Sequence, residues 1–150
     1  MRVYAFACII VAFCVAASIQ DTPYAPCSDG PLPTSLRVEG CDKSPCSLHK
    51  GTDLIAEWDF DAKSDANTLE TKVMVKVAGV IMEYPYPQPN ACKSLSKGKC
   101  PFKKGDQLRY NLKMPISSSY PLVKLNIQFS LFDEKKQVHV CFKLDCKVTN

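Results

Sequence analysis

The sequence predicts an all-β protein, an immunoglobulin-like sandwich of two antiparallel sheets. Apolar and polar residues alternate with period two in five long segments, which is typical of strands that bury one face. No segment repeats its apolar residues at helical spacing over three turns. Strands of this kind need an opposing sheet to cover their apolar face, and about 130 residues after an N-terminal leader suffice for one domain.

The predicted strands of the first half begin with a weak one around residues 36–38. Residues 54–60 alternate apolar and acidic side chains, as does a half-buried strand. Residues 73–77 form the next series, after which the apolar parity shifts at Gly79 and continues to residue 84. A bulge or bend at Gly79 would explain the shift.

Three longer series in the second half cover residues 108–116, 123–131 and 138–148. A polar turn at residues 133–136 separates the last two. Alternation indicates that each strand has one polar, solvent-exposed face and one apolar face. It does not distinguish two facing sheets from one closed sheet. A β-barrel is therefore the alternative architecture.

The first 17 residues resemble a secretory signal peptide, with Arg2 before an apolar run and small residues at Ala16 and Ala17. The run is shorter than the roughly 20 apolar residues that span a bilayer. We therefore expect cleavage after residue 17 and a single domain over residues 18–150. This predicts a secreted, extracellular protein, or one of the endolysosomal lumen.

Seven cysteines remain after the leader, and in a secreted chain they indicate disulfides. Six paired cysteines chosen from seven allow on the order of 100 pairings. Proximity favours Cys41 with Cys46 and Cys92 with Cys100. Cys146 lies on the apolar parity of its strand and is expected to be a buried free thiol, which leaves Cys27 for Cys141.

Composition argues against several classes of function. The formal net charge is only +4, which does not suggest a nucleic-acid binder. His49 and His139 are the only histidines, and neither lies in a metal-binding or catalytic motif. The carboxylates around residues 53–59 are expected to form a solvated strand face. We therefore predict no enzyme activity, no cofactor and no metal.

A lysine cluster surrounds the predicted Cys92–Cys100 loop and includes Lys97, Lys99 and Lys103. Such clusters are usually hydrated loops. The functional interpretation is docking to an anionic membrane surface or a membrane receptor.

Several motifs make the family recognisable. They are Val-Glu-Gly-Cys-Asp-Lys-Ser-Pro-Cys-Ser-Leu-His-Lys-Gly at residues 38–51, Glu-Tyr-Pro-Tyr-Pro-Gln-Pro-Asn-Ala-Cys at 83–92, Lys-Gly-Lys-Cys-Pro at 97–101 and Leu-Lys-Met-Pro-Ile-Ser-Ser-Ser-Tyr-Pro at 112–121. Together they closely resemble the Niemann-Pick type C protein 2 family of secreted lipid carriers, which have the ML lipid-recognition domain. The resemblance covers the whole mature chain, and the family's three bridges coincide with the pairing favoured above.

The resemblance implies a hydrophobic pocket between the two sheets. Tyr84, Ile116 and Tyr120 stand at the family's mouth and wall positions. Other residues expected to line the interior are Leu54, Met82, Met114, Ile127, Phe129 and Phe142. Phe129 and Phe142 replace tryptophans common in mammalian members, Glu83 stands where proline is usual, and Cys146 is additional. These departures resemble arthropod members, including carriers of fatty acids or semiochemicals and mite group 2 allergens.

The leading hypothesis is a secreted, monomeric carrier that holds one sterol, fatty acid or semiochemical and transfers it to a membrane or receptor. The alternative is an innate-immunity or receptor-interaction module that recognises a lipid or a protein partner. The alternative predicts a stable receptor complex and an exposed apolar rim.

Overall fold

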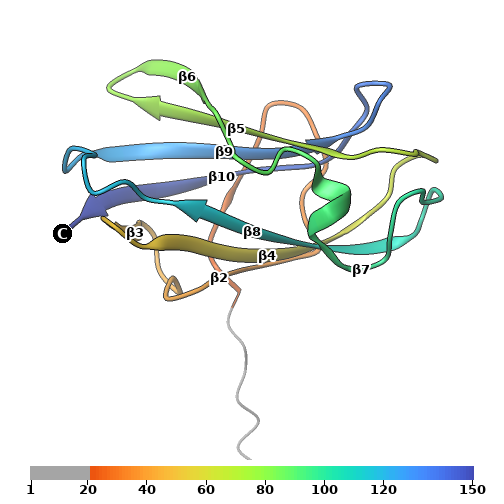
Figure 1. Ribbon diagram of the computed structural model, residues 1–150, viewed down its shortest axis with the longest axis horizontal. Coiled ribbons are helices and arrows are strands. Elements are labelled where there is room, and N and C mark those ends of the chain that lie inside the picture. The colour runs from red at the N-terminus through yellow and green to blue at the C-terminus, as the bar shows by residue number, and fades with distance from the viewer. Residues whose placement is uncertain (1–20) are drawn as a thin grey trace, which may run out of the picture.

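The computed structural model describes residues 21–150, so the predicted leader at residues 1–17 lies outside the described residues. The chain folds into two facing antiparallel sheets, which confirms the predicted sandwich (Figure 1). One sheet has the order β1-β10-β9-β5-β6, with β3 also paired to β10, and the other has the order β2-β4-β8-β7. Within the described chain, no helix is long and apolar enough to cross a membrane.

The elements have the following bounds: β1 Ala25–Pro26, β2 Ser35–Val38, β3 Cys46–His49, β4 Asp53–Asp61, β5 Glu70–Val77, β6 Val80–Tyr84, the 3₁₀ helix η1 Ala91–Ser94, β7 Leu95–Lys97, β8 Gln107–Pro115, β9 Lys124–Phe132 and β10 Val138–Thr149.

The long strands follow the predicted alternation. In β4 every second residue from Leu54 to Phe60 is buried, and β8 shows the same pattern opposite it. The inner faces of the two sheets meet in one hydrophobic core. Because burial of a large apolar side chain contributes roughly 1.5–3 kcal/mol, this alternation fixes which face of each strand points inward.

The parity shift at Gly79 is a hairpin turn instead of a bulge in one strand. Strands β5 and β6 pair antiparallel, with Val77 opposite Val80. The two residues between them, Ala78 and Gly79, have φ values of 49° and 82°. Two positive φ angles are typical of the type I′ turn that joins two-residue hairpins. Of the predicted bulge or bend, the bulge was wrong, because a turn of two residues changes the parity in the same way.

Three short strands, β1, β3 and β7, were not predicted. Strands of two to four residues give too little alternation to detect. Strand β3 runs parallel to the end of β10, with Cys46 opposite Cys146. Strand β3 thereby widens the first sheet beside the C-terminal end of β10.

Two residues on the outer face of β10 were expected to be exposed, since they alternate with the apolar residues of the strand. Both of them, His139 and Cys141, are buried. Cys141 is covered by the N-terminal segment, to which it is joined by the Cys27–Cys141 disulfide. His139 Nδ1 accepts a hydrogen bond from the backbone N–H of Lys63, and Nε2 lies 2.9 Å from Asp133 Oδ2. Neither ring nitrogen of His139 is free for a metal ion.

The other two disulfides join Cys41 to Cys46 and Cys92 to Cys100. The pairing is therefore the one that proximity favoured. Cys146 is the free cysteine of the described chain, and it is buried. Three disulfides are typical of proteins that fold in the secretory pathway.

Candidate functional site

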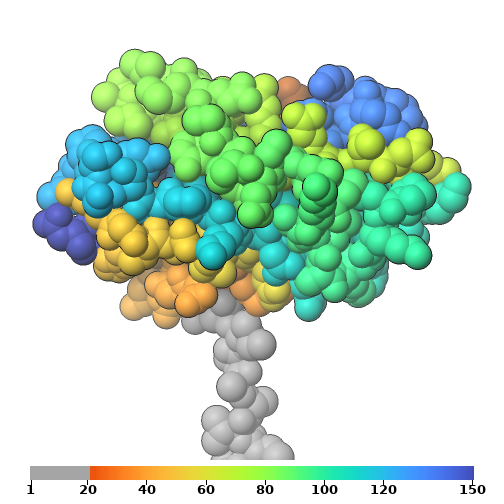
Figure 2. Space-filling view, viewed as in Figure 1, coloured from red at the N-terminus to blue at the C-terminus, as the bar shows by residue number. Residues whose placement is uncertain are grey.

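An apolar cavity of about 360 Å³ lies between the two sheets at one end of the sandwich. It is bounded by the β5–β6 hairpin, the end of β8, the β8–β9 loop and the ends of β3 and β10. Figure 2 shows side chains of the hairpin, in green, directly above those of the β8–β9 loop, in blue, at the left of the view. The lining residues are Leu48, Val75, Val77, Met82, Glu83, Tyr84, Pro85, Met114, Ile116, Tyr120, Pro121, Val123, Leu125 and Val148.

Local backbone structure holds the wall residues in place. Met114 is the last inward-facing residue of β8, opposite Leu54 of β4. Ile116 follows Pro115 and leaves the sheet, but its backbone N–H and C=O bond to Thr52 and Gly51. The proline ends the ladder, while these two bonds fix Ile116 against the cavity. The structure therefore explains why a buried aliphatic side chain stands just after a strand.

The mouth of the cavity is formed where β6 faces the β8–β9 loop. Tyr84 Oη donates a hydrogen bond of 3.4 Å to the backbone oxygen of Pro115, which links the two sheets. Burial, together with the neighbouring Tyr120, raises the pKa of Tyr84 above its usual value. The Tyr84 phenol is therefore neutral at physiological pH and can offer a hydroxyl group to a ligand. The remaining wall is almost entirely apolar.

The structure brings together five of the nine residues predicted to bind ligand, namely Met82, Tyr84, Met114, Ile116 and Tyr120. It places the other four, Leu54, Ile127, Phe129 and Phe142, outside the cavity wall and in the core. The reason is a cluster of rings around Trp58: its centroid lies 5.9 Å from that of Phe129 and 4.9 Å from that of Phe142. These side chains fill the part of the sandwich away from the cavity, packed against one another.

The sequence interpretation missed other wall residues. Val75, Val77, Val123, Leu125 and Val148 line the cavity, and all were on the apolar parity of a predicted strand. The alternation predicted that these side chains face the interior. It did not show at which end of the sandwich the interior contains a cavity. Leu48 belongs to β3, which was too short to predict.

The predicted docking lysines lie away from the cavity. Lys97 is opposite Arg109 in the β7–β8 ladder, five residues before Met114, which corresponds to about 17 Å along the strand. Figure 1 accordingly shows β7 and the β5–β6 turn at opposite ends. Lys99 and Lys103 are also exposed, and Lys103 pairs with Asp65 at 3.6 Å. None of the three contributes to the mouth.

The fold and the cavity together define an ML-domain protein, and the sequence model of the ML domain matches residues 21–148. The NPC intracellular cholesterol transporter 2 homolog a of Drosophila melanogaster is 32% identical over 117 residues, which cover 77% of this chain and 78% of that protein. The chain therefore belongs to the ML-domain family and, within it, to the Niemann-Pick type C2 (NPC2) proteins. This membership agrees with the expectation that the protein is not an enzyme.

Two further similarities are to arthropod members of the family. The mite group 2 allergen Lep d 2 of Lepidoglyphus destructor is 30% identical over 125 residues, or 83% of this chain and 86% of the allergen. The crystal structure of an NPC2 protein from the Japanese carpenter ant superposes with a TM-score of 0.73 at 22% identity, covering 87% of this chain and 98% of that chain. This last similarity confirms the fold.

Proposed function

We propose that the protein carries one hydrophobic molecule in the cavity between its sheets. The observation that carries this proposal is the apolar cavity itself, which opens to solvent beside the half-exposed Met82. An unfilled apolar space costs stability through lost packing contacts. A ligand that occupies it recovers those contacts, so the arrangement favours binding.

The expected affinity follows from the buried area. Burial of about 400 Å² of apolar ligand surface at roughly 25 cal/mol per Å² gives a gross gain near 10 kcal/mol. Loss of translational, rotational and conformational freedom reduces this gain by several kcal/mol. Micromolar to submicromolar dissociation constants are therefore physically reasonable.

The cavity favours a slender ligand over a broad one. Its volume of about 360 Å³ is near the lower end of the roughly 300–1,000 Å³ found for ligand pockets. The ring cluster around Trp58 fills the core outside the cavity wall, so a longer ligand would have to displace side chains such as Phe129 or Phe142. We expect fatty acids and semiochemicals of similar shape to bind more tightly than sterols, although a relative is named as a cholesterol transporter.

Ligand entry requires movement at the mouth. Strand β6 is held by β5 on one side only, and Tyr84 supplies the hydrogen bond across the opening. Outward movement of β6 would break that hydrogen bond and widen the mouth between Tyr84 and Ile116. Met82, which is flexible, can adapt its side chain to different ligands.

The direct test is organic extraction of the natively purified protein, followed by mass spectrometry and by displacement of a fluorescent fatty acid. We expect one co-purified lipid per chain, and stronger displacement by fatty acids than by cholesterol. Absence of any co-purified lipid together with no uptake of either class would reject the carrier.

The alternative function, a receptor-interaction module, is supported by one observation. Residues 21–150 have five exposed large hydrophobic side chains, and four of them, Val80, Ile81, Met82 and Leu122, belong to the two segments at the mouth, β6 and the β8–β9 loop. An exposed apolar rim can be covered by a receptor as well as by a membrane. A pull-down from a membrane extract, repeated with Ile81→Ser, would separate a stable receptor complex from lipid binding alone.

A further inference from the structure

The outward faces of the two sheets differ in how their charges are paired. On the four-stranded sheet, Arg37 contacts Glu57 at 2.8 Å, Arg109 contacts Asp59 at 2.6 Å, and Lys113 lies 3.7 Å from Asp53. Cations and carboxylates therefore compensate one another across the strands of that face.

The outward face of the six-stranded sheet has no such compensation. Pairing in register places Lys76, Asn126 and Asp145 on one face, because residues directly opposite each other share a face. The same parity adds further lysines to it. The lysines on this face are Lys72, Lys76, Lys124, Lys143 and Lys147.

None of these five lysines forms an ion pair within residues 21–150. Three carboxylates of the described strands, Glu70, Glu83 and Asp145, share the face, and Asp145 accepts a hydrogen bond from Asn126 Nδ2 at 2.9 Å. The face therefore carries an excess of positive charge that no ion pair within residues 21–150 compensates.

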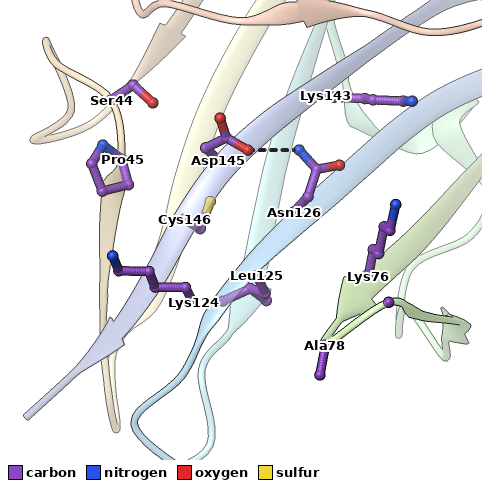
Figure 3. A pocket seen from close by; sticks show the side chains of 11 residues that line it. Ser44, Pro45, Lys76, Ala78, Lys124, Leu125, Asn126, Lys143, Asp145 and Cys146 are labelled. Carbon is purple, nitrogen blue, oxygen red and sulfur yellow. Dashed lines mark hydrogen bonds between the residues drawn. The ribbon is translucent and has the colours of Figure 1, made fainter.

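Three of the lysines border a groove on this face, which Figure 3 shows. Lys76, Lys124 and Lys143 surround its floor, where Asn126 and Asp145 lie. Ser44 and Pro45 of the Cys41–Cys46 loop form one wall, and the β5–β6 turn forms the other. An anionic group in the groove could contact ammonium groups from three strands, which a flat surface would not allow.

We propose that this face docks on an anionic phospholipid bilayer, with lipid phosphate groups in the groove. Charge complementarity is the first argument, since each lysine close to an anionic surface strengthens binding. Continuity with the cavity is the second. Ile81 is directly opposite Lys76, is 62% exposed and shares the basic face, while its neighbour Met82 lines the cavity.

This geometry gives docking a direction. When phosphate groups occupy the groove, Ile81 meets the same surface, and the mouth at Met82 lies at its border. The use of this contact for ligand transfer rests on the proposed carrier function, whereas the binding to the bilayer does not. The two can therefore fail separately.

The test is co-sedimentation of the full mature protein with vesicles of phosphatidylcholine, with or without phosphatidylglycerol. The triple variant Lys76→Gln, Lys124→Gln and Lys143→Gln should bind the anionic vesicles about 100-fold more weakly. The matched control, Lys97→Gln, Lys99→Gln and Lys103→Gln, removes the same charge and should bind as the wild type does. Raising the salt from about 0.1 to 0.5 M should also weaken binding.

Three results would overturn the proposal: equal binding to neutral vesicles, an equal loss in the control triple variant, or binding of inorganic phosphate without any binding to the anionic vesicles. The last result would assign the groove to a free anion. Binding of an acidic protein without any binding to vesicles would overturn it too.

Uptake of a fluorescent fatty acid in solution, measured on both triple variants, keeps the two proposals distinct. We expect both to take up the ligand as the wild type does. Ligand uptake without vesicle binding would remove the docking face and leave the carrier. Vesicle binding without ligand uptake would reject the carrier and leave the docking face.

Discussion

The two ends of the space between the sheets contrast in how they are filled. At one end the rings of Trp58, Tyr110, Phe129 and Phe142 pack against one another, with the Trp58 and Tyr110 centroids 4.6 Å apart. At the other end, valine, methionine and tyrosine side chains surround a cavity. Both ends are built from the same alternating strands. Alternation turns an apolar face of each strand toward the space between the sheets. Side-chain volume and strand separation decide whether side chains fill that space completely.

The filled end is also fastened by carboxylates that accept hydrogen bonds from backbone N–H groups. Asp133 accepts hydrogen bonds from the backbone N–H groups of Lys135 and Gln137 and contacts His139. Glu134 accepts bonds from the backbone N–H groups of Asn67 and Thr68. At the mouth, by contrast, the Tyr84–Pro115 bond joins the sheets. Rigidity at one end thus accompanies adaptability at the other.

The largest expected effect comes from emptying the filled end. Trp58→Ala should lower the free energy of unfolding by about 3–5 kcal/mol, because it removes the side chain at the centre of the ring cluster. Urea denaturation measures this loss. Trp58→Phe is the matched control and should lose much less, since it keeps a ring and removes a buried N–H group that has no hydrogen-bond partner. Equal stability of Trp58→Ala and wild type would contradict the contrast between the ends.

The next effect concerns ligand binding at the hollow end. Ile116→Asp places a carboxyl group in the apolar wall and should weaken uptake of a fluorescent fatty acid at least about 30-fold, as a polar group desolvated by the ligand costs about 2 kcal/mol. Leu32→Asp, at an exposed site outside the cavity, serves as the control. Unchanged uptake by a folded Ile116→Asp variant would show that the ligand binds elsewhere.

Acid should loosen the filled end of the molecule. A hydrogen bond from Arg109 is the main cause that lowers the pKa of Asp59 to about 2. Burial alone would raise the pKa of Asp133, but hydrogen bonds from His139 and two backbone N–H groups outweigh it, so the pKa lies below its usual value. Folded-state values below the unfolded ones stabilise the fold above about pH 5, and this contribution is lost as the pH falls toward 2.

Urea midpoints measured between pH 7 and pH 2 test this expectation. Asp133→Asn should be less stable at neutral pH and should show a shallower loss on acidification, because one of the titrating carboxylates is gone. A variant with the same slope as the wild type would mean that Asp133 does not take part.

The smallest effect is expected at Cys146, beside the cavity end of β10. Burial, with a contribution from Asp145, raises the pKa of the Cys146 thiol to about 12. Little thiolate is present at neutral pH, so iodoacetamide should label Cys146 slowly in the native protein and rapidly in urea. Cys146→Ala should cost only about 1 kcal/mol. Rapid native labelling would indicate that this end of the sheet opens.

The sequence by itself determined an all-β protein and its longer strands, and it favoured the cysteine pairing that the structure has. These features are local or nearly so: period-two alternation fixes the face of each residue in a strand, and sequence proximity limits the two small disulfide loops. It also indicated that Tyr84, Met114 and Ile116 belong to an apolar interior. A turn at Gly79 and a bulge there leave the same parity, so the choice between them needed the pairing of β5 with β6.

Only the tertiary structure decided where the interior is hollow and where the free positive charge lies. Phe129 and Val75 have the same parity, yet the first packs against Trp58 and the second lines the cavity. Lys97 and Lys76 are both exposed lysines, yet only the second borders the groove on the six-stranded sheet. The physical reason is that a cavity or a charged face depends on the distances between side chains of different strands. The alternation along one strand gives no information about those distances.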